Sequence, residues 1–280
     1  MTRALTRAGR LAAKGGAIGL VLPALLLLLW EVLSRFDFAP PNLLPAPSAV
    51  VKALRDLWLS GELLGHIEIT LIRVFLGFLL GTAVATVLAA LTGYSTLWRR
   101  LLDPFLQSLR SIPSMAWIPL FVLWLGIFEA SKVTLIALGA FFPVYLNTMA
   151  GIQQVDRKLV EVARMHGYGG IALVRRVLLP ATLPAYITGL RGGLGLAWMF
   201  VVAAEFMGAS EGLGFLLIDG QQTGRPANII AAILLFALFG KLTDVGLALL
   251  GRRFVKWQDS FQTAEDKKAH AADQTHLQAV

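Results

Sequence analysis

Residues 161–180 read EVARMHGYGGIALVRRVLLP and separate two strongly apolar regions of the chain. Gly169 and Gly170 divide this stretch, so it predicts one short helix over 155–167 and another over 171–178, which Pro180 ends. The stretch and the residues just before it carry too many charges for burial in lipid: Asp156, Arg157, Lys158, Glu161, Arg164, Arg175 and Arg176. We expect the charges to face outward, as suits docking of a partner, and the following apolar residues to face the protein: Val160, Ala163, Met165, Leu173, Val174 and Val177.

The spacing within this stretch is specific. Glu161, Ala163 and Gly167 are followed, nine residues later, by the run Val177–Pro180. This spacing resembles the pattern E-A-A, three residues, G, nine residues, I-x-L-P of the cytoplasmic loop in ABC importer permeases, with valine at 162 and 177 as departures. The resemblance implies a coupling helix that sits in a groove on an ATPase subunit, with these coupling residues: Glu161, Ala163, Gly167, Leu179 and Pro180. The alternative is an ordinary amphipathic connector, which would not need this spacing.

The composition indicates a membrane protein. Of the 280 residues, 56% are hydrophobic and 15% are charged, and the mean hydropathy is +0.69. Soluble domains are usually about 25% charged. The absence of cysteine excludes disulfides and thiolate metal sites. The net charge is +8, and the charged residues lie between the apolar runs. Orientation in a bilayer therefore explains this charge better than nucleic-acid binding does.

Apolar runs predict an all-α integral membrane fold with six spans, at 16–33, 69–91, 101–128, 133–149, 186–206 and 229–250. No small-x-small cleavage site follows the first run, so we read it as an uncleaved span. Three prolines predict a kinked or broken third span whose lipid-spanning part lies near 112–128. Ser48 is expected to cap an interfacial helix that follows it, and Ser131 to cap the fourth span. Residues 209–228 are expected to form a glycine-rich connection.

The distribution of Lys and Arg orients these spans. One side holds 16 of them and the other side 5, and the bias agrees at every loop. Because basic loops stay in the cytoplasm, both termini and the coupling loop are predicted to be cytoplasmic. The predicted organisation is a cytoplasmic N-terminus (1–16), a permease domain (17–252) that includes the coupling loop (151–185), and a flexible tail (253–280).

No catalytic set is visible. The four histidines, of which His166 lies in the coupling loop, are scattered, and they form no metal-binding pair on one helix. The chain contains no G-x-x-x-x-G-K-[ST] motif, so it has no P-loop. We therefore predict a non-catalytic subunit that binds no cofactor or metal, with ATP and Mg²⁺ used by a partner ATPase.

Polar residues within the spans are candidates for the solute path. Arg73 can snorkel to the headgroups, and Lys241 and Asp244 are spaced to neutralise each other on one helix face, which we favour over an anion site. The sequence-based path candidates are Arg110, Asn147 and Glu205. Arg110 either faces a polar cavity or lies at the interface, Asn147 either lines the path or bonds a backbone carbonyl, and Glu205 either meets a basic residue or faces the outer vestibule.

Two further stretches narrow the resemblance. Pro113, Ala116, Trp117, Pro119, Leu120 and Gly126 resemble the P-x-x-A-W-x-P-L…G stretch of nitrate, taurine and sulfonate permeases, and residues 215–244 resemble aliphatic sulfonate permeases most. The resemblance implies a type I importer permease in the bacterial inner membrane, for an aliphatic sulfonate or, alternatively, taurine, nitrate or a thiamine precursor. It also implies the following partners: a second copy of the chain, two ATPase copies, a periplasmic or lipid-anchored solute-binding protein, and membrane lipid.

Two readings from other classes are open. A secondary transporter or channel without an ATPase would need an ion-coupling carboxylate deep in a span, and the only deep acid, Asp244, lies close to Lys241. A membrane scaffold or assembly factor would leave the kinked third span and the spacing of the coupling loop without a purpose.

Overall fold

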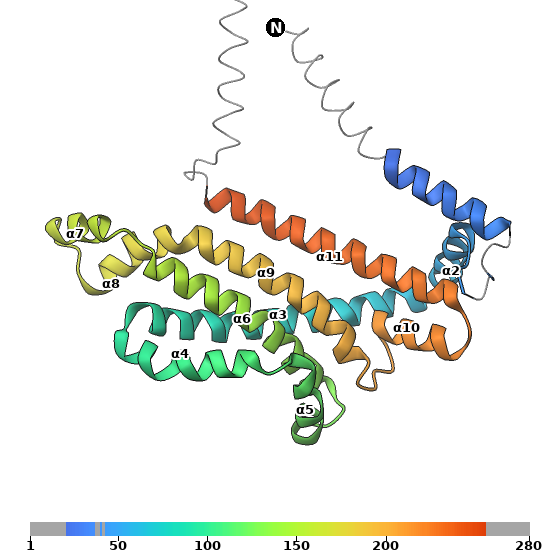
Figure 1. Ribbon diagram of the computed structural model, residues 1–280, viewed down its shortest axis with the longest axis horizontal. Coiled ribbons are helices and arrows are strands. Elements are labelled where there is room, and N and C mark those ends of the chain that lie inside the picture. The colour runs from blue at the N-terminus through green and yellow to red at the C-terminus, as the bar shows by residue number, and fades with distance from the viewer. Residues whose placement is uncertain (1–20, 37–39, 41–42, 256–280) are drawn as a thin grey trace, which may run out of the picture. The chain divides into compact units, whose positions relative to one another are not determined.

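The computed structural model describes residues 21–36, 40 and 43–255, and over these residues it contains helices and turns but no strand (Figure 1). Residues 21–35 are helical. The elements that follow, in chain order, are α2 (Pro47–Leu59), α3 (Glu62–Tyr94), α4 (Thr96–Ser111), η1 (Ser114–Trp117), α5 (Ile118–Leu125), α6 (Glu129–Gln153), α7 (Arg157–Met165), α8 (Gly170–Leu173), the π-helical η2 (Val174–Leu178), α9 (Leu179–Glu205), α10 (Leu213–Gln222) and α11 (Pro226–Phe254).

The chain divides into two compact units. The first contains the residues up to Ile72 together with Glu205–Leu238, and the second contains Arg73–Ala204 together with the residues from Phe239 onward. Helices α3, α9 and α11 contribute residues to both units. The first unit holds α2 and α10, and the second holds α4 to α8.

Four described helices are long and apolar enough to cross a membrane, namely Glu62–Tyr94, Glu129–Gln153, Val174–Glu205 and Pro226–Phe254. They cover the predicted second, fourth, fifth and sixth spans. The bent pair of α4 with η1 and α5, counted as one span, corresponds to the predicted third span and brings the number of candidates to five. The all-α membrane fold is therefore confirmed. Residues 16–20 of the predicted first span lie outside the described residues, as do 1–16 and most of the tail, so the count of six spans stays a prediction.

The third span is broken, as expected from its prolines, but not where we placed the membrane-crossing part. Thr96–Ser111 and Ser114–Leu125 meet at an angle of 94°. The break falls at Ile112 and Pro113, whereas Pro104 lies inside α4. Helix η1 with 4 residues and α5 with 8 residues together rise about 20 Å and cannot cross about 30 Å of hydrocarbon. The prediction that 112–128 is the lipid-spanning part is therefore wrong.

Small residues let α6 pack closely against its neighbours in the second unit. A side chain at Gly81 of α3 would overlap the carbonyl oxygen of Ala137, and one at Gly193 of α9 would lie 2.9 Å from the carbonyl oxygen of Ala140. A core of buried residues joins α3, α4 and α6: Ala85, Ala89, Leu106, Phe141, Val144 and Tyr145. Glycine at 81 and 193 therefore permits the close approach of these helices.

Several local predictions were wrong because tertiary contacts override local patterns. The N-caps are Ala46 and Phe128, not Ser48 and Ser131. Ser48 instead donates its hydroxyl to Glu31 over 3.0 Å, across 17 residues of sequence. The glycine-rich connection over 209–228 contains a helix, α10, whose first backbone N–H groups bond side chains from α3 and α9 within the first unit.

Candidate functional site

The segment 156–167 forms a short helix with a defined start and end. The Asp156 side chain accepts a hydrogen bond from the backbone N–H of Lys158 at 2.9 Å and caps α7. At the other end, the backbone N–H groups of Gly167 and Tyr168 bond the carbonyls of Arg164 and Ala163, at 2.9 and 3.0 Å. This is a Schellman motif, which requires a left-handed residue, and Gly167 has φ +78°. The glycine of the loop pattern therefore ends α7.

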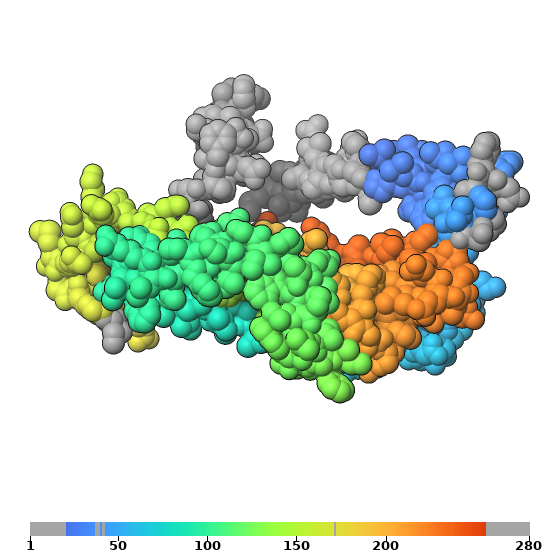
Figure 2. Space-filling model, turned by 60° about the horizontal axis from the view of Figure 1, so that its bottom comes forward, coloured from blue at the N-terminus to red at the C-terminus, as the bar shows by residue number. Residues whose placement is uncertain are grey.

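Helix α7 presents a mixed apolar and charged outer surface. Ala163 is buried, whereas Glu161 is exposed. Leu159, Val162 and Met165 expose 47%, 51% and 86% of their surface, so our expectation that Met165 faces the protein body was wrong. Figure 2 shows α7 and α8 as a protruding lobe beside the turn between α3 and α4. A protruding helix with exposed apolar side chains has the form of a docking surface.

The helix after Gly170 does not end at Pro180, contrary to the sequence-based expectation. Gly170–Leu173, the π turn Val174–Leu178 and α9 follow one another without a break. Pro180 therefore lies inside a continuous run of helix, and the wide π turn before it accommodates both its missing N–H and its ring. Leu179 and Pro180 are both exposed. The loop is therefore joined to a membrane helix by continuous helical backbone.

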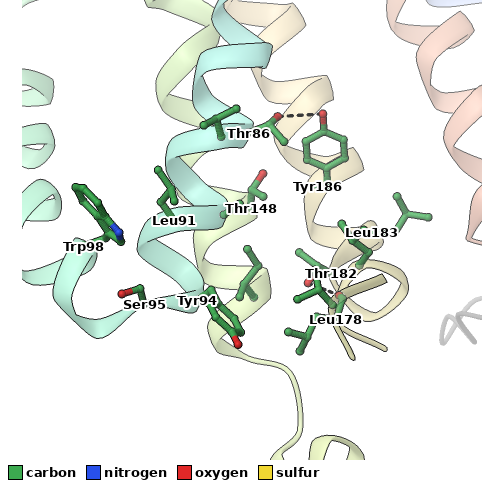
Figure 3. A pocket seen from close by; sticks show the side chains of 15 residues that line it. Thr86, Leu91, Tyr94, Ser95, Trp98, Thr148, Leu178, Thr182, Leu183 and Tyr186 are labelled. Atoms are coloured by element: carbon green, nitrogen blue, oxygen red, sulfur yellow. Dashed lines mark hydrogen bonds between the residues drawn. The ribbon is translucent and has the colours of Figure 1, made fainter. Parts of the chain in front are cut away.

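A cavity of about 650 Å³ lies beside this π turn, within the second unit (Figure 3). Its walls come from α3, α4, α6, η2 and α9: Thr86, Val87, Ala90, Leu91, Tyr94, Ser95, Trp98, Thr148, Ile152, Val174, Leu178, Leu179, Thr182, Leu183 and Tyr186. Most of these side chains are apolar, and the hydroxyls of Thr86 and Tyr186 bond each other at 3.1 Å. Leu178 and Leu179 connect this cavity to the loop, so a shift of η2 would change its shape.

A second cavity of about 570 Å³ lies between α9 and the second-unit part of α11. It contains the ion pair of Arg191 with Asp244, joined by two hydrogen bonds of 2.9 Å each. Lys241 also lines the cavity. The direct partner of Asp244 is not Lys241, as predicted, because Asp244 gives both carboxylate oxygens to Arg191 from the neighbouring helix; Lys241 adds only the attraction of a nearby charge. This pairing joins residues 53 positions apart, which the spacing on one helix does not reveal.

The three candidates for the solute path have separate surroundings. Arg110 is exposed in the last turn of α4. Asn147 is half-buried in α6 and donates to the carbonyl oxygen of Pro143 at 2.8 Å. Glu205 is fully buried at the end of α9. Bonding to a backbone carbonyl was one expectation for Asn147. Whether any of the three contacts solute stays a prediction.

Glu205 organises a buried polar cluster in the first unit that sequence reasoning missed. Its carboxylate accepts from the Thr70 hydroxyl at 2.7 Å and from the backbone N–H of Gly214 at 2.6 Å. Thr70 in turn accepts from the backbone N–H of Leu213 at 2.8 Å, and His66 Nδ1 from that of Gly212 at 3.0 Å. These side chains satisfy the first N–H groups of α10. The glycines of the run GLGF at 212–215 are the signal in the sequence that could have indicated this cluster.

Arg73 does not reach the lipid headgroups as expected. It is 2% exposed and forms two hydrogen bonds to Glu129 at the start of α6, at 2.7 and 2.6 Å. Lys132 approaches the same carboxylate at 2.9 Å. Burial of an arginine within a span calls for such a partner. Over the part of the chain that the structure describes, no three His, Asp or Glu residues are grouped to hold a metal ion.

Comparison with known proteins adds to this geometry. Residues 75–256 match the family model described as "Binding-protein-dependent transport system inner membrane component". A Bacillus subtilis protein named as an aliphatic sulfonates transport permease is 44% identical over 244 residues, 87% of this chain and 88% of that protein. Its Escherichia coli namesake is 39% identical, over 87% and 93%. The E. coli taurine transport system permease protein is 32% identical, over 85% and 89%.

The family match covers the described helices from within α3 to the end of α11, and includes α7 and the Schellman turn at Gly167. The three relatives align with most of their own length. The resemblance read from the loop spacing is therefore confirmed. The chain belongs to the family of binding-protein-dependent transport system inner membrane components, and it is a permease of the ABC transporter class.

Proposed function

We propose that this chain forms the transmembrane pathway of an ATP-driven importer for aliphatic sulfonates. The proposal rests chiefly on the two relatives named as aliphatic sulfonates transport permeases, at 44% and 39% identity. Taurine is the next candidate, because the taurine permease is 32% identical. Taurine is itself a sulfonate with an amino group, so both candidates share the same anionic headgroup. Nitrate and a thiamine precursor are the remaining alternatives.

Coupling to the ATPase is assigned to α7 and the residues around it, namely Glu161, Ala163, Gly167, Leu179 and Pro180. Leu159, Val162 and Met165 expose apolar surface for a groove on the ATPase, and Glu161 adds a charge at the edge. Ala163 packs inward and seats the helix. A push on α7 would reach α9 through α8 and the π turn, and would tilt a membrane helix as a rigid body.

The sequence contains no P-loop, so we infer that the energy comes from a separate subunit, which binds ATP and Mg²⁺. The proposed assembly has two copies of this chain, two ATPase subunits and a periplasmic or lipid-anchored solute-binding protein. A two-fold pair completes a pathway that one copy lines on a single side. Six spans with both termini in the cytoplasm place α7 where ATP is available. The chain itself is not an enzyme in this proposal.

Co-expression with the neighbouring ATPase gene tests the coupling assignment. We expect the ATPase to co-purify with the native chain and its recovery to fall about tenfold for Val162→Glu or Met165→Glu, since a charge would be buried in an apolar contact. Leu59→Glu is the matched control, because Leu59 is 69% exposed but lies at the end of α2, which the predicted orientation places on the other side of the membrane. Undiminished ATPase recovery for both α7 variants, or uptake without any ATPase, would overturn the assignment.

Uptake of radiolabelled butanesulfonate into proteoliposomes that contain the whole complex tests the solute. We expect ATP-dependent uptake that unlabelled butanesulfonate abolishes and equimolar nitrate does not. Strong competition by taurine with weak competition by butanesulfonate would replace the first candidate with the second. Uptake of neither sulfonate would refute the sulfonate assignment and leave the ABC permease class intact.

A further inference from the structure

The cavity between α9 and the second-unit part of α11 carries unbalanced positive charge. Arg191, Lys241 and Arg252 line it, and Asp244 is the one carboxylate among its lining residues in the part of the chain that the structure describes. Arg191 and Asp244 neutralise each other through their two hydrogen bonds. Lys241 makes no hydrogen bond or ion pair with any described residue. Arg252 likewise makes neither with a described residue, and Lys241 has only the nearby charge of Asp244, so these two cationic side chains are available to an anion.

The position of Lys241 makes a lipid-facing role costly. It is the sixteenth of the 29 residues of α11, close to the middle of a helix long enough to span the membrane. A lysine facing hydrocarbon near the centre of a span costs about 3 kcal/mol or more. Such residues are retained where they face a polar cavity, and Lys241 lines one. The charge of Lys241 thus lies at a polar cavity, where water or an anion can solvate it.

The cationic groups are arranged along one face of α11. Lys241, Asp244, Ala248 and Arg252 are spaced by three or four residues and all line the cavity. Arg252 lies 11 residues beyond Lys241, about 16 Å along the helix, at the end that the charge distribution places in the cytoplasm. Apolar side chains also line the cavity, namely Val245 and Leu249 of α11 and Ile187 of α9.

We propose that this cavity is a binding station for the solute, in which Lys241 receives the anionic headgroup and the apolar side chains receive the alkyl part. The solute class is a monovalent organic anion with a short apolar tail. Arg252 receives the headgroup next, on the way to the cytoplasm. Asp244 holds Arg191 in place and keeps the site from binding so strongly that the solute cannot leave. The proposal rests on the proposed import function and adds a location for the solute.

The absence of cysteine from the chain allows a direct accessibility test. Ala248→Cys places a thiol in the cavity, and Leu250→Cys, on an exposed position outside it, is the control. In the reconstituted complex, a thiol-reactive reagent with a sulfonate group should modify the first variant and not the second, since thiolates form only in water. Butanesulfonate should slow this reaction. No modification of Ala248→Cys would overturn the proposal.

The charge of Lys241 is tested in the same Ala248→Cys background with anionic and cationic reagents of equal size. Lys241→Gln should lower the ratio of anionic to cationic reaction rates about tenfold, because the local positive field concentrates anions. Lys241→Arg should keep the ratio. Arg253→Gln is the matched control, since Arg253 neighbours Arg252 but does not line the cavity. An unchanged ratio for Lys241→Gln would overturn the proposal.

A phospholipid headgroup is the other source of the same anionic chemistry. Protection by butanesulfonate in vesicles of pure phosphatidylcholine supports the solute. Protection only when phosphatidylglycerol is added, and none by butanesulfonate, overturns the proposal in favour of lipid. ATP-dependent uptake by the native complex is measured in parallel. If uptake is present and the ratio of anionic to cationic reaction rates is unchanged for Lys241→Gln, only this site is refuted. If uptake is absent, the proposed function itself fails.

Discussion

The ion pair of Arg73 with Glu129 predicts an unequal effect of removing its two members. Arg73 is 2% exposed and the Glu129 side chain is 52% exposed. Glu129→Ala takes two charge-assisted hydrogen bonds from a guanidinium that water cannot reach without opening the contact between α3 and α6. Arg73→Met leaves a carboxylate that water and Lys132 still reach. The glutamate substitution should therefore cost more than the arginine substitution.

The magnitudes follow from these exposures. Loss of one partner of a buried pair costs about 3–5 kcal/mol, and the lower end applies because Glu129 is half exposed, so we expect about 3 kcal/mol for Glu129→Ala. Arg73→Met resembles the loss of a surface pair and should cost about 1 kcal/mol. For a chain of this size, about 1 kcal/mol shifts the unfolding midpoint by about 2–4 °C. The expected shifts are thus about 6–12 °C and about 2–4 °C.

The assay is thermal unfolding of the detergent-purified permease at one fixed scan rate, because unfolding of such proteins is often irreversible. Lys132→Met is the control and should shift the midpoint by less than Glu129→Ala does. The double variant Arg73→Met with Glu129→Met should recover most of the loss, since an apolar pair replaces the charges. Equal shifts for the two single variants, or a larger one for Arg73→Met, would refute the reasoning from exposure.

Three further predictions concern other contacts. Gly167→Ala should cost about 1 kcal/mol, because alanine is strained at φ +78°, and should lower ATPase recovery about fivefold. Gly167→Asn should lower recovery less, because asparagine tolerates this conformation, and a pull-down titration compares the two variants. Glu205→Gln should cost about 1–2 kcal/mol, because an amide cannot accept with both ends, and the loss is read as a lower unfolding midpoint. Gly81→Val should cost about 1–3 kcal/mol by overlap with Ala137, whereas Gly65→Ala, with open space around it, should not; the two midpoints are compared in one scan.

Apolar runs predicted the location of the membrane helices but not their ends. The helix predicted over 133–149 runs from Glu129 to Gln153, and the one over 186–206 begins at Leu179 after the helical turns from Gly170. Helices extend beyond their apolar part because backbone hydrogen bonds form equally well between polar residues. Glu129, the first residue of α6, bonds Arg73 of another helix, a partner that the local sequence does not identify.

Ion pairs were the hardest feature to predict. Spacing on one helix favoured Lys241 with Asp244, yet Asp244 pairs with Arg191 across 53 positions, and Arg73 pairs with Glu129 across 56. A pair on one helix uses two flexible side chains at fixed spacing, which contributes only a few tenths of a kcal/mol. A pair between helices is set by packing, through residues such as Gly81 that determine how closely the helices approach. Sequence alone does not provide that distance.

The loop shows the opposite balance, because its structure depends on contacts between residues that are close in sequence. The Schellman turn at Gly167 and the cap at Asp156 are both formed by neighbouring residues, and the pattern includes the glycine of the first. The helix continues through Pro180 instead of ending there as predicted, and this has a mechanical consequence. A helix that ended there would act as a hinge and absorb a push from an ATPase. Continuous helix through the π turn Val174–Leu178 instead carries the displacement into α9, and Leu178 and Leu179 carry it to the apolar cavity beside it. Under the proposed coupling role, the π turn is therefore the part of the chain where stiffness decides how much of the ATPase movement reaches the membrane.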